Sequence, residues 1–127
     1  MRTSLTLALI LLAVVIAGGA ACEGLTARVS EQYISAAEEL MALTEGENWQ
    51  RAEETARAYL ERWEQTERWL QILINHDDTD DVTLALQHVL AGIGARDMSA
   101  CLEACHTLRE CAGHIHHRDA FTWGNVM

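Results

Sequence analysis

The sequence predicts an all-α fold, with an N-terminal hydrophobic helix followed by an up-and-down bundle of about four helices. From residue 26 onward, apolar residues recur at spacings of three and four, which is the period of an amphipathic helix. No segment alternates apolar and polar residues for long enough to indicate a strand. The chain contains no proline, the residue that most sharply interrupts a helix. A length of 127 residues, of which 50% are hydrophobic, suits one compact domain.

The first 22 residues have the composition of an export or anchor segment. An uncharged apolar run over residues 5–17 follows Arg2, and the small residues after it allow cleavage after Ala20 or Ala21, as in a signal peptide. Extended from residue 5 to Cys22, the uncharged stretch has 18 residues. As a helix it is about 27 Å long, which is the lower limit for crossing a bilayer. The segment therefore fits a membrane anchor as well as a cleaved signal.

A third interpretation concerns Cys22. Residues 19–22 resemble a bacterial lipobox, in which this cysteine is lipidated. We expect residues 1–22 to be a signal peptide or membrane anchor and residues 23–127 to be the helical domain. With Arg2 before the apolar run and Glu23 after it, the positive-inside rule places the domain on the extracytoplasmic side of a bacterial cell membrane, with secretion as the alternative.

The first two helices of the bundle are predicted over residues 26–44 and 49–75. Gly46 is expected to take the positive φ that ends the first helix, and Asn48 to cap the second. The first helix has an apolar stripe of Val29, Tyr33, Ala36, Ala37, Leu40 and Leu43. The second has a seam of Trp49, Ala52, Ala56, Tyr59, Trp63, Thr66, Leu70 and Leu73.

A second stripe begins in the last two turns of the second helix. It consists of Trp69, Ile72 and His76, so this end of the helix is expected to be buried on two sides or to line a groove.

The third and fourth helices are predicted over residues 80–94 and 97–115. Asp97 is expected to cap the fourth helix, and residues 116–127 have no clear period. The fourth helix has an inward face of Cys101, Ala104, Cys105, Leu108, Ala112 and Ile115.

The charge of the chain argues against one class of partner. The formal net charge is −10, with 9 basic residues against 19 acidic ones and no lysine. Nucleic-acid binding depends on basic side chains that neutralise phosphates, and an anionic membrane surface attracts the same side chains. We therefore expect no nucleic-acid partner.

Acidic residues and one histidine are concentrated between the second and third helices. His76, Asp78 and Asp80 are weak candidates for metal ligands, because imidazole and carboxylate groups bind divalent cations. The glycine and glutamate of an EF-hand loop are absent at the required positions. The alternative is that these acidic residues cap the third helix and interact with its positive N-terminal end.

Cysteines and histidines are enriched near the C-terminus. The set resembles a metal centre in composition, but on one helix Cys101 and Cys105 point inward while His106 and His114 point away. No paired ligands occur at a zinc-site spacing. We expect buried free thiols and exposed imidazoles, and no cofactor. The whole set is Cys101, Cys105, His106, Cys111, His114, His116 and His117.

No catalytic motif is recognisable. The chain has no nucleophile elbow, no glycine-rich phosphate loop and no His-Glu-x-x-His sequence, so we expect that it is not an enzyme. Three of the four tryptophans, Trp49, Trp63 and Trp69, are interpreted as bundle packing rather than as a platform for a ligand.

The order of residues resembles the DUF4363 family over about residues 25–127. The matching positions are Asn48-Trp49 with Ala52, then Trp63 and Trp69, the segment Ile74 to Val82, Ala85-Leu86 and Asn125-Val126. The resemblance implies a small bacterial protein with an N-terminal hydrophobic segment, more often an uncleaved anchor than a lipoprotein, and a helical domain of unknown function. It implies no catalytic residue.

The function expected from the sequence is that of a membrane-attached extracytoplasmic module. It would attach through residues 5–22 and act without catalysis, as an interaction module or accessory to a membrane-protein partner. Its recognition surface would consist of Trp69, Ile72, His76 and Asp78. The alternative is an extracytoplasmic metal-binding protein that uses the His76 segment or the C-terminal cysteines and histidines. A third alternative, a hydrolase, would use His76 and an aspartate as an acid/base pair.

Overall fold

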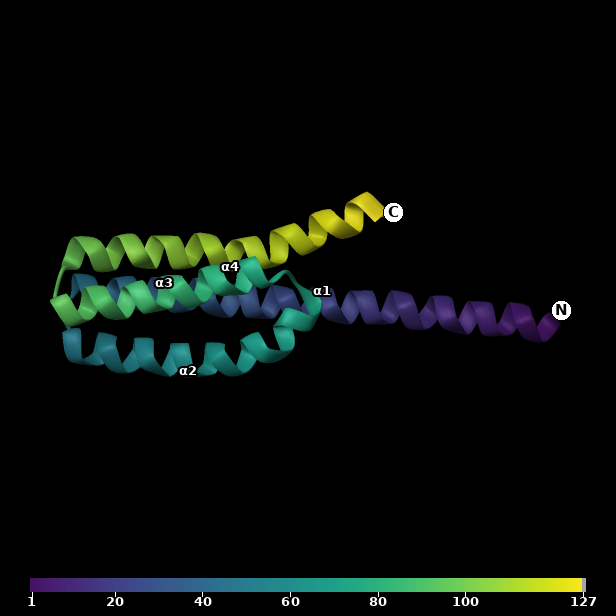
Figure 1. The fold of residues 1–127 in the computed structure, drawn as a ribbon, viewed down its shortest axis with the longest axis horizontal. Helices are drawn as coiled ribbons and strands as arrows, with labels where there is room; N and C mark the ends of the chain where they lie inside the picture. Colours follow the sequence, from purple (N-terminus) through teal and green to yellow (C-terminus); the bar gives the residue numbers. More distant parts are fainter. Residues whose placement is uncertain (127) are drawn as a thin grey trace.

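The structure is a computed structural model that describes the backbone of residues 1–126 and the side chains of residues 1–116. It contains the helices α1 (Arg2–Glu45), α2 (Trp49–Leu73), α3 (His76–Ala95) and α4 (Met98–Val126). The described part holds no strand, which confirms the all-α prediction. The bundle lies at one end of the molecule, and the N-terminal part of α1 projects from it (Figure 1).

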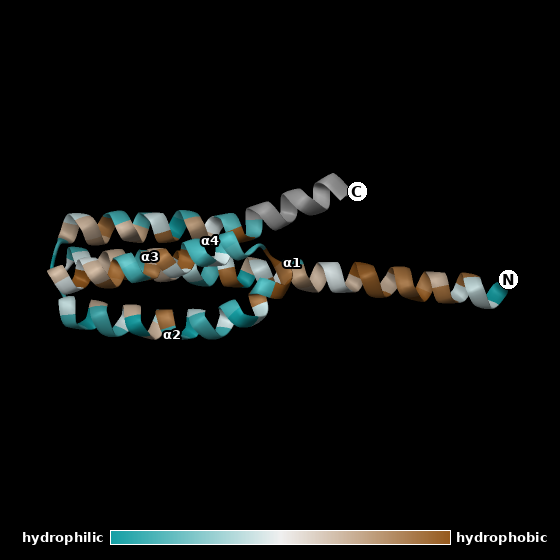
Figure 2. Cartoon of the chain, in the orientation of Figure 1, coloured by the Kyte–Doolittle hydropathy of each residue, from teal (hydrophilic) through white to brown (hydrophobic). Residues whose placement is uncertain are grey.

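The hydrophobic segment and the first bundle helix form one continuous helix. The sequence predicted them as separate units, whereas α1 runs unbroken over 44 residues, or about 66 Å. Gly18 and Gly24 do not interrupt it, since each lies in open space without positive φ. Alanine and leucine around them favour the helix, and no proline ends it. The projecting half is strongly apolar (Figure 2).

The bundle is an up-and-down arrangement whose core confirms the predicted stripes. Each helix packs against the next in sequence, and α4 returns to pack against α1. The Tyr33 and Trp63 rings, from α1 and α2, meet edge to face with centroids 5.0 Å apart. All six predicted inward positions of α4 are buried, namely Cys101, Ala104, Cys105, Leu108, Ala112 and Ile115.

The first link between helices differs in detail from the prediction. Gly46 has φ −77°, and Glu47 takes the positive φ of 56° instead. Asn48 occupies the cap position of α2, but its side chain makes no capping hydrogen bond. The end of α1 is stabilised by the backbone, because the Asn48 amide donates to the Leu43 carbonyl over 3.0 Å.

The second link is shorter than predicted. α2 ends at Leu73 and α3 begins at His76, four residues before the predicted start at residue 80. Asn75 is the cap, and its side chain accepts a hydrogen bond from the Asp77 amide over 3.4 Å. The acidic residues predicted to form a connection therefore lie in the first turns of α3, where the positive end of the helix favours them.

The third link and the C-terminal helix complete the bundle. Arg96 takes a left-handed conformation with φ 51°, and the Asp97 carboxylate accepts from the Ala100 amide over 3.1 Å, which confirms the predicted cap. The predicted end of the fourth helix at residue 115 is wrong, because α4 continues to Val126. Nothing in the sequence there is a strong helix terminator, since proline is absent.

Candidate functional site

The residues expected to form a recognition surface lie at the end of the bundle where α1 projects, but they do not share one environment. Trp69 and Ile72 are exposed, at 39% and 84% of their surface, and His76 is also exposed. The prediction that this end of α2 is buried on two sides is wrong for Ile72. Asp78 is buried, with 6% of its surface exposed.

Asp78 is buried because α3 begins earlier than the sequence predicted. With a helix that starts at His76, Asp78 and Thr79 lie four and three residues before Val82 and share its core-facing stripe. Thr79 donates its hydroxyl to the His76 carbonyl over 2.9 Å. The Gln71 amide of α2 reaches the same hydroxyl at 3.5 Å. Asp78 is thus a buried residue of α3, and the exposed part of the expected recognition surface is Trp69, Ile72 and His76.

The weak metal candidates are not brought together as a ligand set. His76 and Asp80 are exposed and Asp78 is buried. Among the residues that the structure describes, no group of three histidine, cysteine or acidic side chains is arranged to hold a metal ion.

The C-terminal cysteines and histidines are divided between core and surface, as the helical projection predicted. Cys101 and Cys105 are buried and Cys111 is half-buried, while His106 and His114 are exposed. His116 is half-buried, and its Nδ1 atom lacks a hydrogen-bond partner within the described residues. The side chain of His117 lies outside the described residues.

The buried thiols have the character of packing groups rather than nucleophiles. Burial raises the pKa of Cys105 to about 12, and the neighbouring Cys101 thiol adds to the shift. Burial also raises the pKa of Cys111, helped by the negative charge of Asp81. The Cys101 sulfur lies 3.1 Å from the Thr44 hydroxyl oxygen of α1. A thiol reacts as the thiolate, so the raised pKa of Cys105 and of Cys111 keeps these two thiols protonated at neutral pH.

An aromatic cluster between α1 and α2 confirms the predicted packing of Trp63, and Trp49 is partly buried against the core, but the prediction is wrong for Trp69, which is exposed. Trp63 is fully buried and donates its indole N–H to the Thr83 hydroxyl of α3 over 2.8 Å. The Tyr59 hydroxyl donates to the Glu39 carboxylate over 2.6 Å, which raises the pKa of Tyr59 to about 12. Burial raises the pKa of Tyr33. The sequence analysis did not identify the Glu39–Tyr59 contact, because neither residue has a motif that pairs them.

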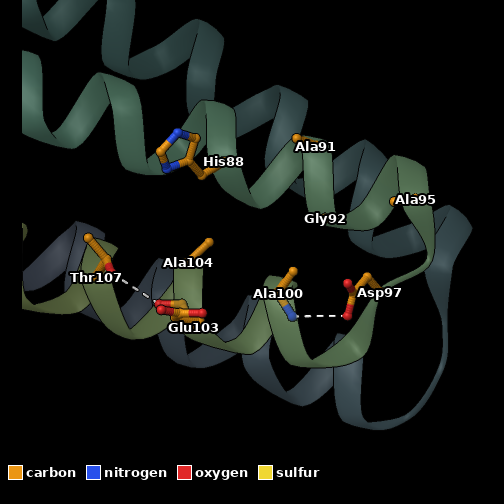
Figure 3. A pocket seen from close by; sticks show the side chains of 9 residues that line it. All are labelled: His88, Ala91, Gly92, Ala95, Asp97, Ala100, Glu103, Ala104 and Thr107. Carbon is orange, nitrogen blue, oxygen red and sulfur yellow. Dashed lines mark hydrogen bonds between the residues drawn. The ribbon is translucent and has the colours of Figure 1, made fainter.

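A groove between α3 and α4 was also missed by the sequence analysis (Figure 3). Its volume is about 420 Å³. The two helices approach closely there, since a Cβ atom on Gly92 would lie 2.9 Å from the backbone of Cys101. The signal in the sequence was the small residues at helical spacing on both helices. Small side chains line the floor, with polar ones at the rim, and the lining is Ala91, Gly92, Ala95, Ala100, Ala104, His88, Asp97, Glu103 and Thr107.

Comparison with known proteins supports the resemblance seen in the sequence. Neither curated proteins nor solved structures gave a match. The model of a domain of unknown function, DUF4363, matches residues 25–126. The match begins beside Thr26, the first buried residue of the bundle, and ends with the last residue of α4. It therefore covers the bundle and leaves out the projecting apolar segment. The chain belongs to the DUF4363 family.

Proposed function

We propose that this protein is a membrane-attached, extracytoplasmic interaction module that acts without catalysis as an accessory to an integral membrane protein. The observation that carries the proposal is the unbroken helix α1. Within the described part of the chain, none of its most apolar window is buried, and its other half forms one wall of the bundle. A rigid connection of this kind would hold the bundle at a fixed height above a membrane.

The projecting half of α1 supports membrane attachment through its composition and length. Its most apolar window has a mean hydropathy of 2.6, and none of that window is buried against the bundle. Residues 5–22 span about 27 Å, close to the hydrocarbon thickness of a bilayer. An apolar surface of this size is rare on a water-soluble monomer. A signal sequence near the N-terminus has the same composition, so the mass of the mature protein is part of the test.

The charge pattern supports an extracytoplasmic bundle. Arg2 precedes the apolar run, Glu23 follows it, and the chain as a whole has a formal net charge of −10. Basic residues beside an apolar segment are retained on the cytoplasmic side of a membrane, whereas acidic residues have little influence and whole domains are translocated largely regardless of their charge.

The absence of a recognised catalytic motif in the sequence favours a binding role. Within the described part of the chain, the groups with shifted pKa are two tyrosines and two cysteines that pack between helices. Tyr59 contacts the Glu39 carboxylate, but this hydrogen bond raises the pKa of the Tyr59 hydroxyl rather than activating it as a nucleophile.

The proposal is tested by photo-crosslinking in native membranes. A photoreactive amino acid is placed at Ile16 on the apolar segment and at Leu84 on the outer face of α3, where 51% of the leucine surface is exposed. We expect the same membrane protein to be captured from both positions. Capture from neither position would contradict an accessory role.

Mass spectrometry of the mature protein separates the modes of attachment. An anchor retains residues 1–22, and we expect the full-length mass. A chain cleaved after Ala20 or Ala21 without lipid would support secretion and contradict membrane attachment. A diacylglycerol group on Cys22 would replace the helical anchor with a lipid anchor.

A further inference from the structure

Three large apolar side chains are exposed at the end of the bundle from which α1 projects. Leu25 has 42% of its surface exposed, Trp69 39% and Ile72 84%. Beyond residue 22, Leu84 is the one other large hydrophobic side chain that is exposed within the described part of the chain. Leu25, Trp69 and Ile72 are called the anchor-side patch below.

Contacts between α1 and α2 define the height of this patch. The Tyr33 and Trp63 rings are in contact, and Tyr59 donates to Glu39. Since α1 and α2 are antiparallel, each step forward along α2 corresponds to a step backward along α1. Ile72 therefore lies about level with residues 24–26, and Trp69 about level with residues 27–29. In Figure 1, the link between α2 and α3 lies beside the point where α1 leaves the bundle.

Because α1 is one unbroken helix, the level of a residue along it gives its distance from the end of the apolar segment. At the rise of an α-helix, Ile72 lies about 3–6 Å and Trp69 about 8–10 Å beyond the end of the apolar run at Cys22. The headgroup layer on each side of the hydrocarbon core is about 5–7 Å thick. When residues 5–22 span the hydrocarbon, Ile72 is at the height of the headgroups, and the backbone of Trp69 lies about 1–5 Å above that layer, a gap shorter than its side chain.

The chemistry of the patch suits this layer. Tryptophan is enriched at membrane interfaces because its ring is apolar and its N–H is polar, and aliphatic side chains beside it add buried apolar area. The same end of the bundle carries the exposed acidic residues Glu23, Asp77 and Asp80. Anionic lipids attract basic segments, so these carboxylates favour zwitterionic headgroups instead.

We propose that the anchor-side patch inserts into the zwitterionic headgroup layer around the protein's own anchor. The patch and the anchor then hold the bundle to the membrane at two places, which restricts its tilt. This inference rests on the proposed membrane attachment and goes beyond it, because it assigns Trp69 and Ile72 to lipid rather than to a protein partner.

The test uses the purified full-length protein in vesicles of phosphatidylcholine. A photoreactive amino acid is placed in turn at Ile16, Ile72 and Leu84. Leu84 is the matched control, since Thr83 contacts Trp63 and places this exposed residue about level with residues 33–34, roughly 16–18 Å beyond Cys22. We expect lipid adducts at Ile16 and Ile72, with at least fivefold less at Leu84.

The three positions distinguish failure of this inference from failure of the proposed attachment. Lipid adducts at Ile16 but not at Ile72 would overturn the inference and leave the anchor in place. Equal adducts at Ile72 and Leu84 would also overturn it, because contact would then not depend on height. Absence of lipid adducts at Ile16 would overturn both. In native membranes, a protein adduct at Ile72 would overturn the lipid assignment and favour a recognition surface.

Fluorescence provides a second measurement that needs no unnatural residue. Phosphatidylcholine that carries a nitroxide on its choline group quenches tryptophans at the level of the headgroups. We expect Trp69→Phe to remove most of the quenching seen in the wild-type protein. The matched control is Trp49→Phe, because Trp49 begins α2 at the opposite end of the bundle. Equal quenching in Trp69→Phe and wild-type protein would overturn the inference.

Discussion

The two halves of α1 share one backbone and have opposite surroundings. Residues 5–22 are the most apolar part of the chain and have almost no contact with the rest of it. The bundle half is less apolar, yet it is the half that is buried, and its buried residues are Thr26, Val29, Ser30, Tyr33, Ala36, Ala37, Leu40 and Thr44. Burial in this molecule therefore follows contact between helices rather than local hydropathy. The exposed apolar half requires a nonaqueous environment such as a membrane. The importance of helix contact is tested by substituting the same residue type at a position with contacts and at one without.

Leucine provides the largest contrast. Leu40 is fully buried in the bundle half of α1, and 55% of the Leu12 surface is exposed in the projecting half. We expect Leu40→Ala to lower the free energy of unfolding of the bundle by about 2–5 kcal/mol, since it loses apolar burial and leaves a cavity. Leu12→Ala should leave bundle unfolding unchanged.

Circular dichroism during urea unfolding in detergent checks this pair of leucines. Equal destabilisation by the two substitutions would show that the projecting half packs against the bundle, which would remove the basis of the comparison.

Two glycines of α3 are expected to differ less in their effect on stability. A Cβ atom on Gly92 would meet the Cys101 backbone at 2.9 Å, whereas one on Gly94 would meet nothing within 4 Å. We expect Gly92→Ala to destabilise by about 1–3 kcal/mol, because α3 and α4 must move apart. Gly94→Ala should stabilise by up to about 1 kcal/mol through helix propensity. Thermal unfolding measures both, and stabilisation by Gly92→Ala would contradict the close approach in the structure.

Helix capping gives an effect of about 1 kcal/mol. Asp97 accepts a hydrogen bond from the Ala100 amide, while Asn48 occupies a cap position without such a bond. We expect Asp97→Ala to lower the free energy of unfolding by about 1 kcal/mol, and Asn48→Ala to lower it clearly less. Urea unfolding of the two variants checks this order, and the reverse order would mean that the α1–α2 link depends on the Asn48 side chain.

The same dependence on contact explains what the sequence could predict. The core stripes followed from spacing alone, because residues such as Cys101 and Cys105 lie on one face of any regular helix. Helix boundaries depend on competing local signals. Asn75 caps α3, which starts at His76, four residues before the predicted start, and this moves Asp78 from the expected recognition surface into the interior. A residue's face on a helix is predictable only once its helix has been assigned.

Contacts between two helices could not be predicted from the sequence. The groove between α3 and α4 requires Gly92 to lie opposite Cys101, and the height of Trp69 requires the pairing of Tyr33 with Trp63. Neither pairing has a sequence motif. The absence of proline is compatible with a continuous α1, but the small residues near residue 20 also fit a cleavage site, so the sequence predicts two separate segments.

The tyrosines give the smallest expected effect. The hydrogen bond to Glu39 is the main cause that raises the pKa of Tyr59 to about 12, whereas burial is the main cause of the raised pKa of Tyr33. A raised pKa in the folded state means that the bundle holds the Tyr59 proton more tightly than the unfolded chain does. The resulting stability is present below pH 10 and is lost as the pH rises from 10 towards 12.

Glu39→Gln separates the two tyrosines, because it removes the carboxylate and leaves the burial of Tyr33 unchanged. We expect the pKa of Tyr59 to move down towards 10 and the loss of stability between pH 10 and 12 to become shallower. Absorbance of tyrosinate at alkaline pH follows both groups. An unchanged titration of both would show that Glu39 does not contact Tyr59. A change in the pKa of Tyr33 instead of Tyr59 would mean that the Glu39 carboxylate contacts the buried Tyr33 ring. In that case too, contact between helices would determine the effect of the residue.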